Sequence, residues 1–404
     1  MSASTGRVQS GVPPRKILLV SEVFPPAIGG SGVLLENVYA RLPGAEVTVL
    51  TDGHSGDEPV RRGPLMVHCV SMQAPDWGLL RPSCFRRHWR LTQEIRRLTP
   101  PGGLVHCGRG LPEGLSARLA QLTGGAPYVC WTHGEELGFA STSRELTWLT
   151  RRVLAGARGV IANSMNSKRL LVEKWQLPDR RVHVVHPGVD AERFHPAPNG
   201  EDLRARFAKP EDVVFLSVGR LQRRKGHDTV IAALPAVRRI LPQIRYVIVG
   251  DGPERGSLQE QARQTGVADI THFVGAVPEV DLPRWYRASD VFVLPNRAEG
   301  VDFEGFGIVF LEAAASGLPV VGGRSGGVPE TMIEGETGRL VGGTDSNELA
   351  GVMGELARMP EQRARFGRAG RERVVADFSW ARAAARVADL DDVLRSPLLQ
   401  TRAA

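Results

Sequence analysis

Short apolar runs rich in β-branched residues alternate with amphipathic segments of helical length along the whole chain. Most of these runs are apolar at successive positions and end in Gly, Ser or His. The runs that predict strands cover 16–20, 46–50, 65–70, 104–107, 128–133, 159–164 and 182–188, followed by 213–219, 245–252, 270–277, 290–295 and 319–323. This pattern is typical of parallel strands covered by helices on both faces, with functional loops at their C-terminal ends. The sequence therefore predicts an α/β protein.

The alternation breaks at 190–207, a stretch with three turn residues between polar neighbours, Pro196, Pro198 and Gly200. We place a domain boundary there. We therefore expect two Rossmann-like, doubly wound domains, 1–192 and 193–379, that face each other across a cleft.

The chain of 404 residues is long for one domain and comfortable for two. After Gly343 the sequence becomes helical and rich in arginine. Its tail, 379–395, is long enough to cross back to the first domain. We therefore assign a C-terminal helix, about 380–404, to the first domain.

Lysine and arginine (51) exceed aspartate and glutamate (44), which gives a net charge of +7. That excess suits a protein that handles phosphates or touches an anionic membrane, but it is modest for a nucleic-acid binder. No clustered basic arm with interleaved aromatic residues occurs in the sequence. We expect no nucleic-acid partner.

The four cysteines include no C-x-x-C pair, and no Cys/His cluster has zinc spacing. Cys69, Cys107 and Cys130 lie in predicted strands, so we expect buried free thiols. Residues 1–16 have no apolar core for export, and no apolar run reaches 18 residues. We expect a cytoplasmic protein that reaches a membrane, if at all, peripherally at its inner face.

The segment 84–98 is basic and amphipathic, with its larger apolar residues near one face, namely Phe85, Trp89, Ile95 and Leu98. Such a helix could lie on an anionic membrane. The alternative is an ordinary helix that packs those residues inward, and we favour packing.

Seven segments carry a family resemblance: "FPPAIGGSG", "VVHPGVD", "SVGRLQRRKGHDTVI", "VIVGDGP", "ITHFVGAVP", "EGFGIVFLEAAASGLPVV" and "GGVPETMIEGETGRLV". Together they resemble the retaining glycosyltransferases of family four, whose GT-B fold has two Rossmann-like domains. The resemblance covers nearly the whole chain and is strongest over 213–342. The segment "VDFEGFGIVFLE" looks most similar to the phosphatidylinositol-mannoside mannosyltransferases, which use GDP-mannose. The resemblance implies a nucleotide-sugar donor and a lipid or glycan acceptor.

Two glutamates, Glu304 and Glu312, stand in an otherwise apolar stretch punctuated by glycine. A helix is expected to start near Gly307, where free N–H groups and the helix dipole suit a diphosphate. The resemblance implies that Glu312 binds the ribose hydroxyls and that Glu304 approaches the donor sugar. Otherwise Glu304 is an ordinary loop residue and Glu312 a solvated helix position.

Arg220 directly follows a predicted strand, and Lys225 comes five residues later. Cations placed beside a departing diphosphate lower the barrier to breaking the sugar bond. The resemblance implies this role for both residues. We interpret Arg223 and Arg224 as a solvated surface turn.

Gly29 and Gly30 lie between the first strand and its helix, where the missing Cβ lets the backbone approach a phosphate or sugar. A tight turn is the alternative, and the NAD fingerprint lacks its third glycine. The resemblance implies that the donor contacts come from Gly29, Gly30, Arg220, Lys225, Val277, Gly305, Phe306, Gly307, Ile308, Val309 and Glu312.

His133 ends a predicted strand and would open into the cleft. The resemblance implies that it contacts the donor sugar, which gives the catalytic set His133, Arg220, Lys225 and Glu304. The acidic pair Glu135 and Glu136 either meets an acceptor or lies in a solvated loop.

No metal and no cofactor are expected. The one Asp-x-Asp motif, Asp389 to Asp391, lies in the C-terminal tail and is interpreted as a solvated helix face. In GT-B enzymes basic side chains and a helix dipole replace the metal. No side chain stands out as a covalent nucleophile, so we expect the diphosphate to leave from the front face and help to take the acceptor proton.

Two other classes remain open. A sugar-nucleotide epimerase or a phosphorylase could share the fold, and so could a non-catalytic protein that binds nucleotide sugars. The intact set of Arg220, Lys225, Glu304 and Glu312 argues against a decayed site.

Overall fold

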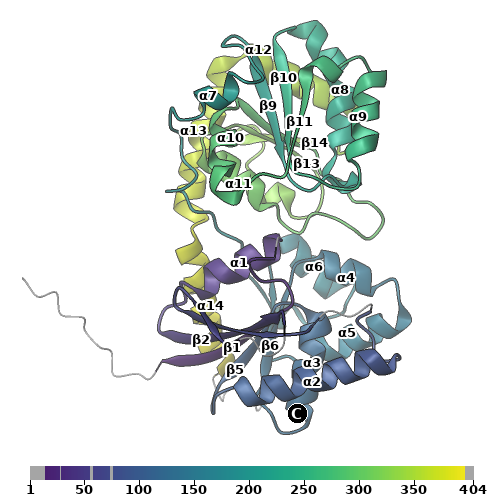
Figure 1. Ribbon diagram of the computed structural model, residues 1–404, viewed down its shortest axis with the longest axis vertical. Helices are drawn as coiled ribbons and strands as arrows, with labels where there is room; N and C mark the ends of the chain where they lie inside the picture. Colours follow the sequence, from purple (N-terminus) through teal and green to yellow (C-terminus); the bar gives the residue numbers. More distant parts are fainter. Residues whose placement is uncertain (1–13, 28, 55–57, 73–75, 396–404) are drawn as a thin grey trace, which may run out of the picture.

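The computed structural model describes residues 14–27, 29–54, 58–72 and 76–395. Figure 1 shows two lobes stacked along the long axis, each with helices packed around a central sheet. The C-terminal helices run down one side, from the second lobe to the first.

The first sheet has eight strands within the described residues, in the order β3-β4-β2-β1-β5-β6-β7-β8. The strands are β1 (Arg15–Ser21), β2 (Ala45–Asp52), β3 (Val60–Arg62), β4 (Leu65–Val70), β5 (Leu104–Cys107), β6 (Tyr128–Thr132), β7 (Val160–Ala162) and β8 (Val182–Val184). Its pairs are parallel except β3 with β4. The sequence pattern did not predict β3, because this exposed edge strand has no buried face to mark it.

The second sheet has the order β11-β10-β9-β12-β13-β14, with all pairs parallel among the described residues. Its strands are β9 (Val213–Val218), β10 (Ile244–Val249), β11 (Thr271–Gly275), β12 (Val291–Leu294), β13 (Val320–Gly323) and β14 (Gly338–Val341). Only β14 lacked a predicted counterpart. The predicted boundary between 192 and 193 lies in the segment that joins β8 to β9.

The helices of the first lobe are α1 (Gly30–Tyr39), α2 (Pro82–Leu98), α3 (Leu115–Leu122), α4 (Glu135–Ala140), α5 (Arg144–Gly156) and α6 (Met165–Glu173). Those that follow in the chain are α7 (Glu201–Arg204), α8 (His227–Ile240), α9 (Arg255–Gln264), α10 (Leu282–Arg287), α11 (Ile308–Ala315), α12 (Ser346–Arg358), α13 (Pro360–Asp377) and α14 (Trp380–Arg395). Short turns at η1 (Gly110–Gly114), η3 (Arg223–Lys225) and η6 (Val328–Thr331) shape the loops discussed below.

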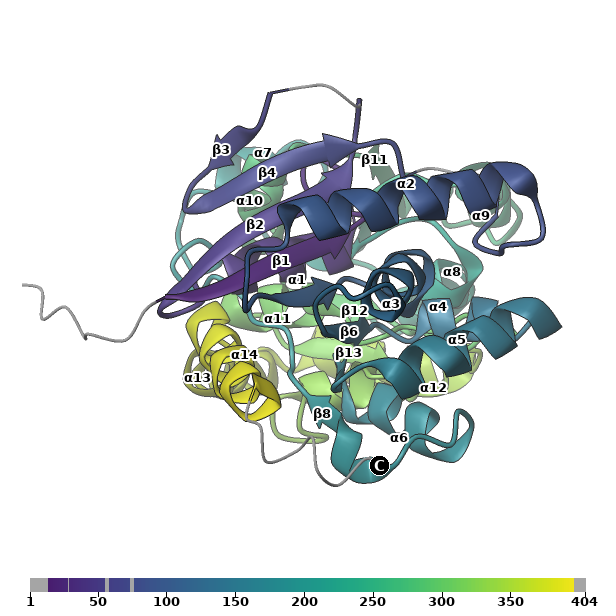
Figure 2. The ribbon, with the colours of Figure 1, turned by 90° about the horizontal axis from the view of Figure 1, so that it is seen from below.

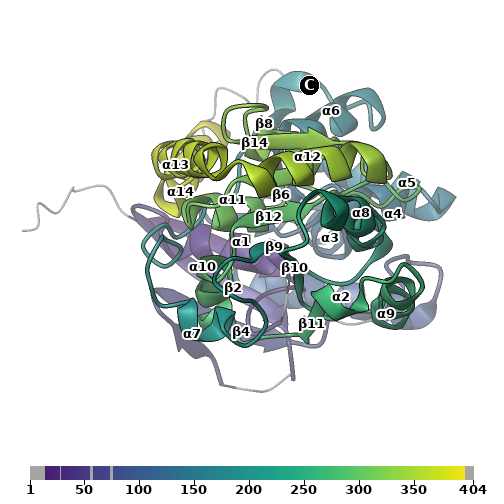
Figure 3. The ribbon, with the colours of Figure 1, turned by 90° about the horizontal axis from the view of Figure 1, so that it is seen from above.

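Both sheets are buried on two faces, which is why their strands read as continuous apolar runs. Leu18 and Val20 of β1 belong to the apolar cluster under α2, α3 and α5, whereas Ile17 and Leu19 belong to the cluster under α1 and α14. In the second lobe α8, α9 and α12 gather on one side of the sheet and α10, α11 and α13 on the other (Figure 3). The predicted GT-B arrangement of two doubly wound domains is confirmed.

Helix α14 crosses back to the first lobe, as predicted, and packs against α1. The remainder of the predicted helix, 396–404, lies outside the described residues. The interpretation of its Asp-x-Asp motif as solvated is wrong for Asp391, whose side chain has no exposed surface. His106 Nε2 donates to Asp391 Oδ1 at 3.2 Å, and Arg395 Nε donates to Oδ2 at 2.6 Å. Burial alone would raise the pKa of Asp391, but these partners lower it, so the carboxylate anchors α14.

Helix α2 lies along the outside of the first lobe (Figure 2). Ile95 is buried, as the packing interpretation expects, but Phe85 is 52% exposed and Trp89 49% exposed. The buried face instead uses Cys84, Arg87, His88, Leu91, Thr92 and Ile95. The prediction that Phe85 and Trp89 pack inward is therefore wrong.

Cys107 and Cys130 are free thiols buried in β5 and β6, as predicted. Cys69 is only partly buried, because its strand β4 lies near the edge of the sheet. Among the described residues, no helix combines the length and apolar character needed to cross a bilayer.

Candidate functional site

His133 directly follows β6 and is buried at the carboxyl end of the first sheet. Its Nε2 lies 2.9 Å from the carbonyl oxygen of Gly108, so Nε2 carries the proton and donates. Burial, together with Arg109, lowers the pKa of His133 to about 4. The imidazole is therefore neutral near pH 7, and its Nδ1 keeps a lone pair that can accept a hydrogen bond.

The loop before α11 brings the second lobe against His133. A Cβ at Gly305 would collide with the carbonyl oxygen of His133, so only glycine permits this approach. Asn163 Nδ2 donates to the same carbonyl at 3.3 Å. The structure thus brings together two predicted site residues that lie far apart in the sequence.

One carboxylate oxygen of Glu304, Oε2, accepts three hydrogen bonds. Lys225 Nζ donates to Glu304 Oε2 at 2.5 Å, Arg224 Nη1 at 2.8 Å and Asn296 Nδ2 at 3.0 Å. Burial would raise the pKa of Glu304, but Lys225 and Arg224 outweigh it and lower the pKa. Glu304 is therefore a fixed anion that holds Lys225 in place, and it is not an ordinary loop residue.

The interpretation of Arg224 as part of a solvated surface turn is wrong. Its side chain is only 11% exposed and forms an ion pair with Asp302 at 3.1 Å as well as with Glu304. Arg223 is exposed, as expected. The run of basic residues could not show which arginine points inward, because the answer depends on how η3 meets the loop before α11.

Arg220 lies just after β9 and is exposed. Within the part of the chain that the structure describes, its side chain has no hydrogen-bond or ion-pair partner. A Cβ at the preceding residue, Gly219, would lie 3.7 Å from Cε of Lys225, so the two cations arise at the same end of the sheet. Lys225 is held by Glu304, whereas Arg220 is available to a ligand.

Helix α11 begins where the sequence predicts, with Gly307 at its N-cap and a φ of 97°. This left-handed conformation favours glycine. The first N–H groups of an α-helix have no carbonyl partner one turn earlier in the helix. Ile308 packs against the first-lobe cluster that includes α1, so the start of α11 lies at the boundary between the lobes. The side chain of Phe306 is buried in the second-lobe core, which leaves only its backbone for a ligand.

Glu312 is half-buried on α11, and Tyr286 Oη donates to its Oε2 at 2.8 Å. Burial raises the pKa of Glu312 to about 7, although Tyr286 and Arg193 lower it. The side chains of Val277 and Val309 pack against the same apolar cluster as Tyr286. The alternative of a solvated Glu312 is therefore wrong, and the pKa values of the two glutamates are shifted in opposite directions, raised for Glu312 and lowered for Glu304.

Gly29 and Gly30 stand at the start of α1. A Cβ at Gly30 would meet no described atom within 4 Å, so the backbone there is open to a ligand. In Figure 1 α1 and α11 face each other across the boundary between the lobes. The glycine loop is therefore on the side of the first lobe that faces the predicted donor site.

Glu136 is buried rather than solvated, unlike the exposed Glu135. Its Oε1 accepts the backbone N–H of His133 at 2.8 Å. Burial raises the pKa of Glu136 to about 7. The sequence left Glu136 undecided, and in the structure its carboxyl group holds the backbone of His133.

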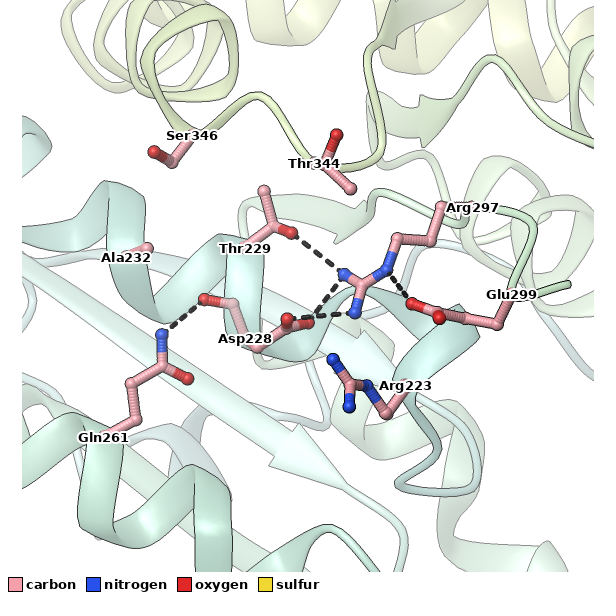
Figure 4. A pocket seen from close by; sticks show the side chains of 9 residues that line it. All are labelled: Arg223, Asp228, Thr229, Ala232, Gln261, Arg297, Glu299, Thr344 and Ser346. Carbon is pink, nitrogen blue, oxygen red and sulfur yellow. Dashed lines mark hydrogen bonds and ion pairs between the residues drawn. The ribbon is translucent and has the colours of Figure 1, made fainter.

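Figure 4 shows a polar recess of about 290 Å³ in the second lobe, between α8, α9 and the start of α12. Arg297 donates to Asp228 at 2.8 Å and to Glu299 at 2.6 Å. These carboxylates neutralise Arg297, and none of the predicted site residues lines the recess. It is therefore a poor site for a diphosphate.

No group of three His, Cys, Asp or Glu side chains in the described ranges could hold a metal ion. Metal-independent chemistry stays a prediction.

Family models match both lobes: "Glycosyltransferase Family 4" over residues 28–193 and "Glycosyl transferases group 1" over residues 199–373. The GDP-mannose-dependent alpha-(1-6)-phosphatidylinositol monomannoside mannosyltransferase of Mycolicibacterium smegmatis is 35% identical over 93% of this chain and 97% of its own. The chain belongs to glycosyltransferase family 4. It is a hexosyltransferase, which favours glycosyl transfer over the epimerase, phosphorylase and non-catalytic alternatives.

Other relatives of this family 4 enzyme differ in what their names say they act on. The GDP-mannose-dependent monoacylated alpha-(1-6)-phosphatidylinositol monomannoside mannosyltransferase of Corynebacterium glutamicum is 31% identical over 91% of this chain and 95% of its own. The D-inositol 3-phosphate glycosyltransferase of Streptomyces avermitilis is 35% identical, but over only 59% of this chain and 52% of its own.

Solved structures share the GT-B fold. Anabaena HepE in complex with UDP matches with a TM-score of 0.78 at 21% identity, covering 94% of this chain and 100% of that one. WaaG, a glycosyltransferase involved in lipopolysaccharide biosynthesis, matches with a TM-score of 0.70 at 18% identity, covering 93% and 99%.

Proposed function

We propose that this enzyme transfers mannose from GDP-mannose, with retention of configuration, to a hydroxyl group of a lipid or glycan acceptor. The observation that carries the donor assignment is the 35% identity to a GDP-mannose-dependent mannosyltransferase over almost the full length of both chains. The arrangement of charges at the boundary between the lobes supports it.

The leaving diphosphate meets Arg220, Lys225 and the first N–H groups of α11. Negative charge grows on the diphosphate as the sugar bond breaks, so groups that are already in place stabilise the transition state more than the ground state. Glu304 keeps the Lys225 ammonium fixed through the 2.5 Å hydrogen bond, which removes the need to reorganise it during the reaction. Glu312 accepts hydrogen bonds from the ribose.

The sugar lies between His133 and the loop that carries Glu304 and Gly305. A neutral His133 accepts a hydrogen bond from a sugar hydroxyl through Nδ1 and does not act as a general acid near pH 7. The fixed negative charge of Glu304 favours the positive charge that develops on the sugar. The departing diphosphate takes the acceptor proton from the same face, which yields retention without a covalent intermediate.

A screen of nucleotide sugars tests the donor assignment. Purified enzyme should hydrolyse or transfer from GDP-mannose faster than from GDP-glucose, UDP-glucose or UDP-N-acetylglucosamine, and the same rate should persist in excess EDTA. A faster rate with a UDP-sugar would contradict the donor. Loss of turnover in EDTA that Mg²⁺ or Mn²⁺ restores would contradict the metal-independent mechanism.

The exposed face of α2 supports a peripheral membrane contact in the proposed function. Phe85 and Trp89 are one turn apart, so they project from the same side of the helix. Five exposed arginines surround them: Arg81, Arg86, Arg90, Arg96 and Arg97. Apolar side chains beside arginines fit the interface of an anionic bilayer, where a lipid acceptor would be found.

Replacing Phe85 and Trp89 together with serine should weaken binding to vesicles of phosphatidylcholine and phosphatidylglycerol by about tenfold or more, because both apolar anchors are lost. Co-sedimentation at several salt concentrations measures this. Val280→Ser is the control, since Val280 is also an exposed apolar residue, at 79%, but lies in the second lobe. Equal binding by the double variant and the wild type would exclude α2 as the docking surface.

A further inference from the structure

A second group of charged residues lies in the first lobe, outside the predicted donor site. Glu22 follows β1, Arg109 lies two residues after β5 and His133 follows β6. These strands are neighbours in the order β1-β5-β6, and the chain winds outward in opposite directions from β1 and β5. In open α/β sheets, the crevice at such a reversal of strand order is where ligands bind.

Glu22 and Arg109 are largely buried yet lack hydrogen bonds between their side chains. Arg109 Nη1 lies 3.7 Å from Glu22 Oε2, and the side chains are 14% and 19% exposed. Across the described residues the guanidinium makes no hydrogen bond, although it has five N–H donors. Charged groups removed from water are costly unless they are hydrogen-bonded. This pair therefore keeps unused hydrogen-bonding capacity, and both side chains retain some exposed surface.

An aromatic ring lies beside the pair. The guanidinium carbon of Arg109 is 6.0 Å from the centre of the Trp77 ring, and Phe139 packs edge-on against Trp77 at 5.0 Å. Trp77 is half-buried and packs against the first-lobe core. An aromatic ring together with planar charged groups offers an apolar surface and directional hydrogen bonds.

Two buried carboxyl groups hold this arrangement in place. Glu113 has no exposed surface, and its Oε1 accepts the backbone N–H of Glu22 at 2.8 Å. Glu136 does the same for His133. Within the described part of the chain, Oε2 of each of these two side chains has no hydrogen-bond partner. Both carboxyl groups act on the charge of Arg109 through space.

The charges around Arg109 are unfavourable to an anion. Burial would lower the pKa of Arg109, but Glu113, Glu136 and Glu22 raise it, as does Glu135. Four carboxyl groups therefore act on one guanidinium. Burial raises the pKa of Glu113 and of Glu136 to about 7, so these two are only partly charged near neutral pH. Arg87 is a further cation that acts on Glu22. A second anion, such as the phosphate of a lipid headgroup, would meet net repulsion here, whereas hydroxyl groups can donate to Glu22 and accept from Arg109.

We propose that Glu22, Arg109 and Trp77 form the subsite for the acceptor's reacting ring, a neutral pyranose or cyclitol with adjacent hydroxyl groups. The inference rests on the proposed glycosyl transfer and adds the chemistry of the acceptor. Glu22 accepts from one hydroxyl and Arg109 donates to its neighbour, while the ring lies against Trp77. The phosphate of a lipid acceptor lies outside this subsite.

Titration of full-length enzyme, saturated with GDP, with myo-inositol and with methyl α-mannoside tests the subsite. Saturation-transfer NMR should detect binding of at least one of these polyols, and Arg109→Met and Glu22→Gln should each weaken it about tenfold or more. Arg109→Lys keeps the charge beside Glu113 and Glu136 but loses the planar fork, so it should fold normally and still bind several-fold more weakly. Arg223→Met, which removes an exposed arginine elsewhere, is the matched control and should not change binding.

Three results would overturn the proposal: no polyol binding by wild-type enzyme, unchanged binding in both Arg109 variants, or tighter binding of inositol 1-phosphate than of myo-inositol at this site. GDP affinity and acceptor-free hydrolysis of GDP-mannose, measured on the same samples, report on the donor site. Both should stay within about twofold of wild type in the Arg223→Met control. If the proposed function is wrong, wild-type enzyme will not turn over GDP-mannose. If only the subsite is wrong, wild-type enzyme will turn over GDP-mannose but polyol binding will not depend on Arg109 and Glu22.

Discussion

Arg220→Ala and Lys225→Ala are each expected to lower turnover by about 100-fold or more, which is the usual effect of losing one preorganised donor at a developing negative charge. The two variants should differ in stability. Arg220 is exposed and unpaired among the described residues, so its loss should leave the unfolding midpoint unchanged. Lys225 is buried in an ion pair with Glu304. Its loss removes one of the positive charges that stabilise the buried Glu304 carboxylate, so Lys225→Ala should also lower the free energy of unfolding.

Arg223→Ala is the matched control for both, because Arg223 is an exposed cation in the same segment between β9 and α8. Steady-state kinetics with the preferred donor, beside urea unfolding, separates the effects on turnover and on stability. Near-normal turnover in folded Arg220→Ala would contradict the assignment of this side chain to the diphosphate.

The two glutamates of the α11 region should give opposite signatures. Glu312→Ala is expected to weaken both donor and free GDP by about ten- to hundredfold, since a hydrogen bond to a charged group contributes about 1.5 to 3 kcal/mol. The pKa of Glu312 is about 7, so the carboxylate that accepts from ribose forms only as pH rises through that value. Wild-type affinity for GDP should therefore increase from pH 6 to pH 8, and the variant should lose this dependence.

Glu304→Gln should leave GDP affinity unchanged or slightly higher, because Lys225 and Arg224 keep their positive charges beside the diphosphate. Its turnover should fall, because the fixed negative charge near the sugar is lost. Calorimetric titration of GDP against both variants, together with their turnover, checks this contrast. An equal loss of GDP affinity in the two variants would show that Glu304 belongs to the nucleotide site.

The main elements of the fold could be predicted from the sequence because a strand that is buried on both faces appears as a run of consecutive apolar residues. The run 16–20 is apolar at each position after Lys16, since α1 and α14 cover one face of β1 and α2, α3 and α5 cover the other. Strand β3 has no such run, because its three residues are exposed. The start of α11 was predictable since Gly307 supplies a backbone conformation that other residues avoid.

The errors arise where a side chain's environment depends on distant parts of the chain. Asp391 is buried because it meets His106, which is 285 positions away. Arg224 turns inward because the loop with Asp302 and Glu304 closes over it. The spacing of Phe85 and Trp89 predicts a shared face, but only the packed structure shows that another face of α2 covers the core.

Arg109 and Glu113 had no sequence signal, and only the order of the strands brings them beside Glu22. The predicted site residues were recoverable chiefly from the family resemblance. Their roles toward a donor stay predictions.

The central claim, retaining mannosyl transfer, is tested most directly by the configuration of the product. The enzyme should be incubated with GDP-mannose, whose sugar is α-linked, and an acceptor from a lipid extract or a soluble polyol, and the new glycosidic bond assigned by NMR. The account predicts a mannoside with the α configuration. A β-linked product, or consumption of GDP-mannose without any glycoside in the presence of every acceptor tried, would contradict it.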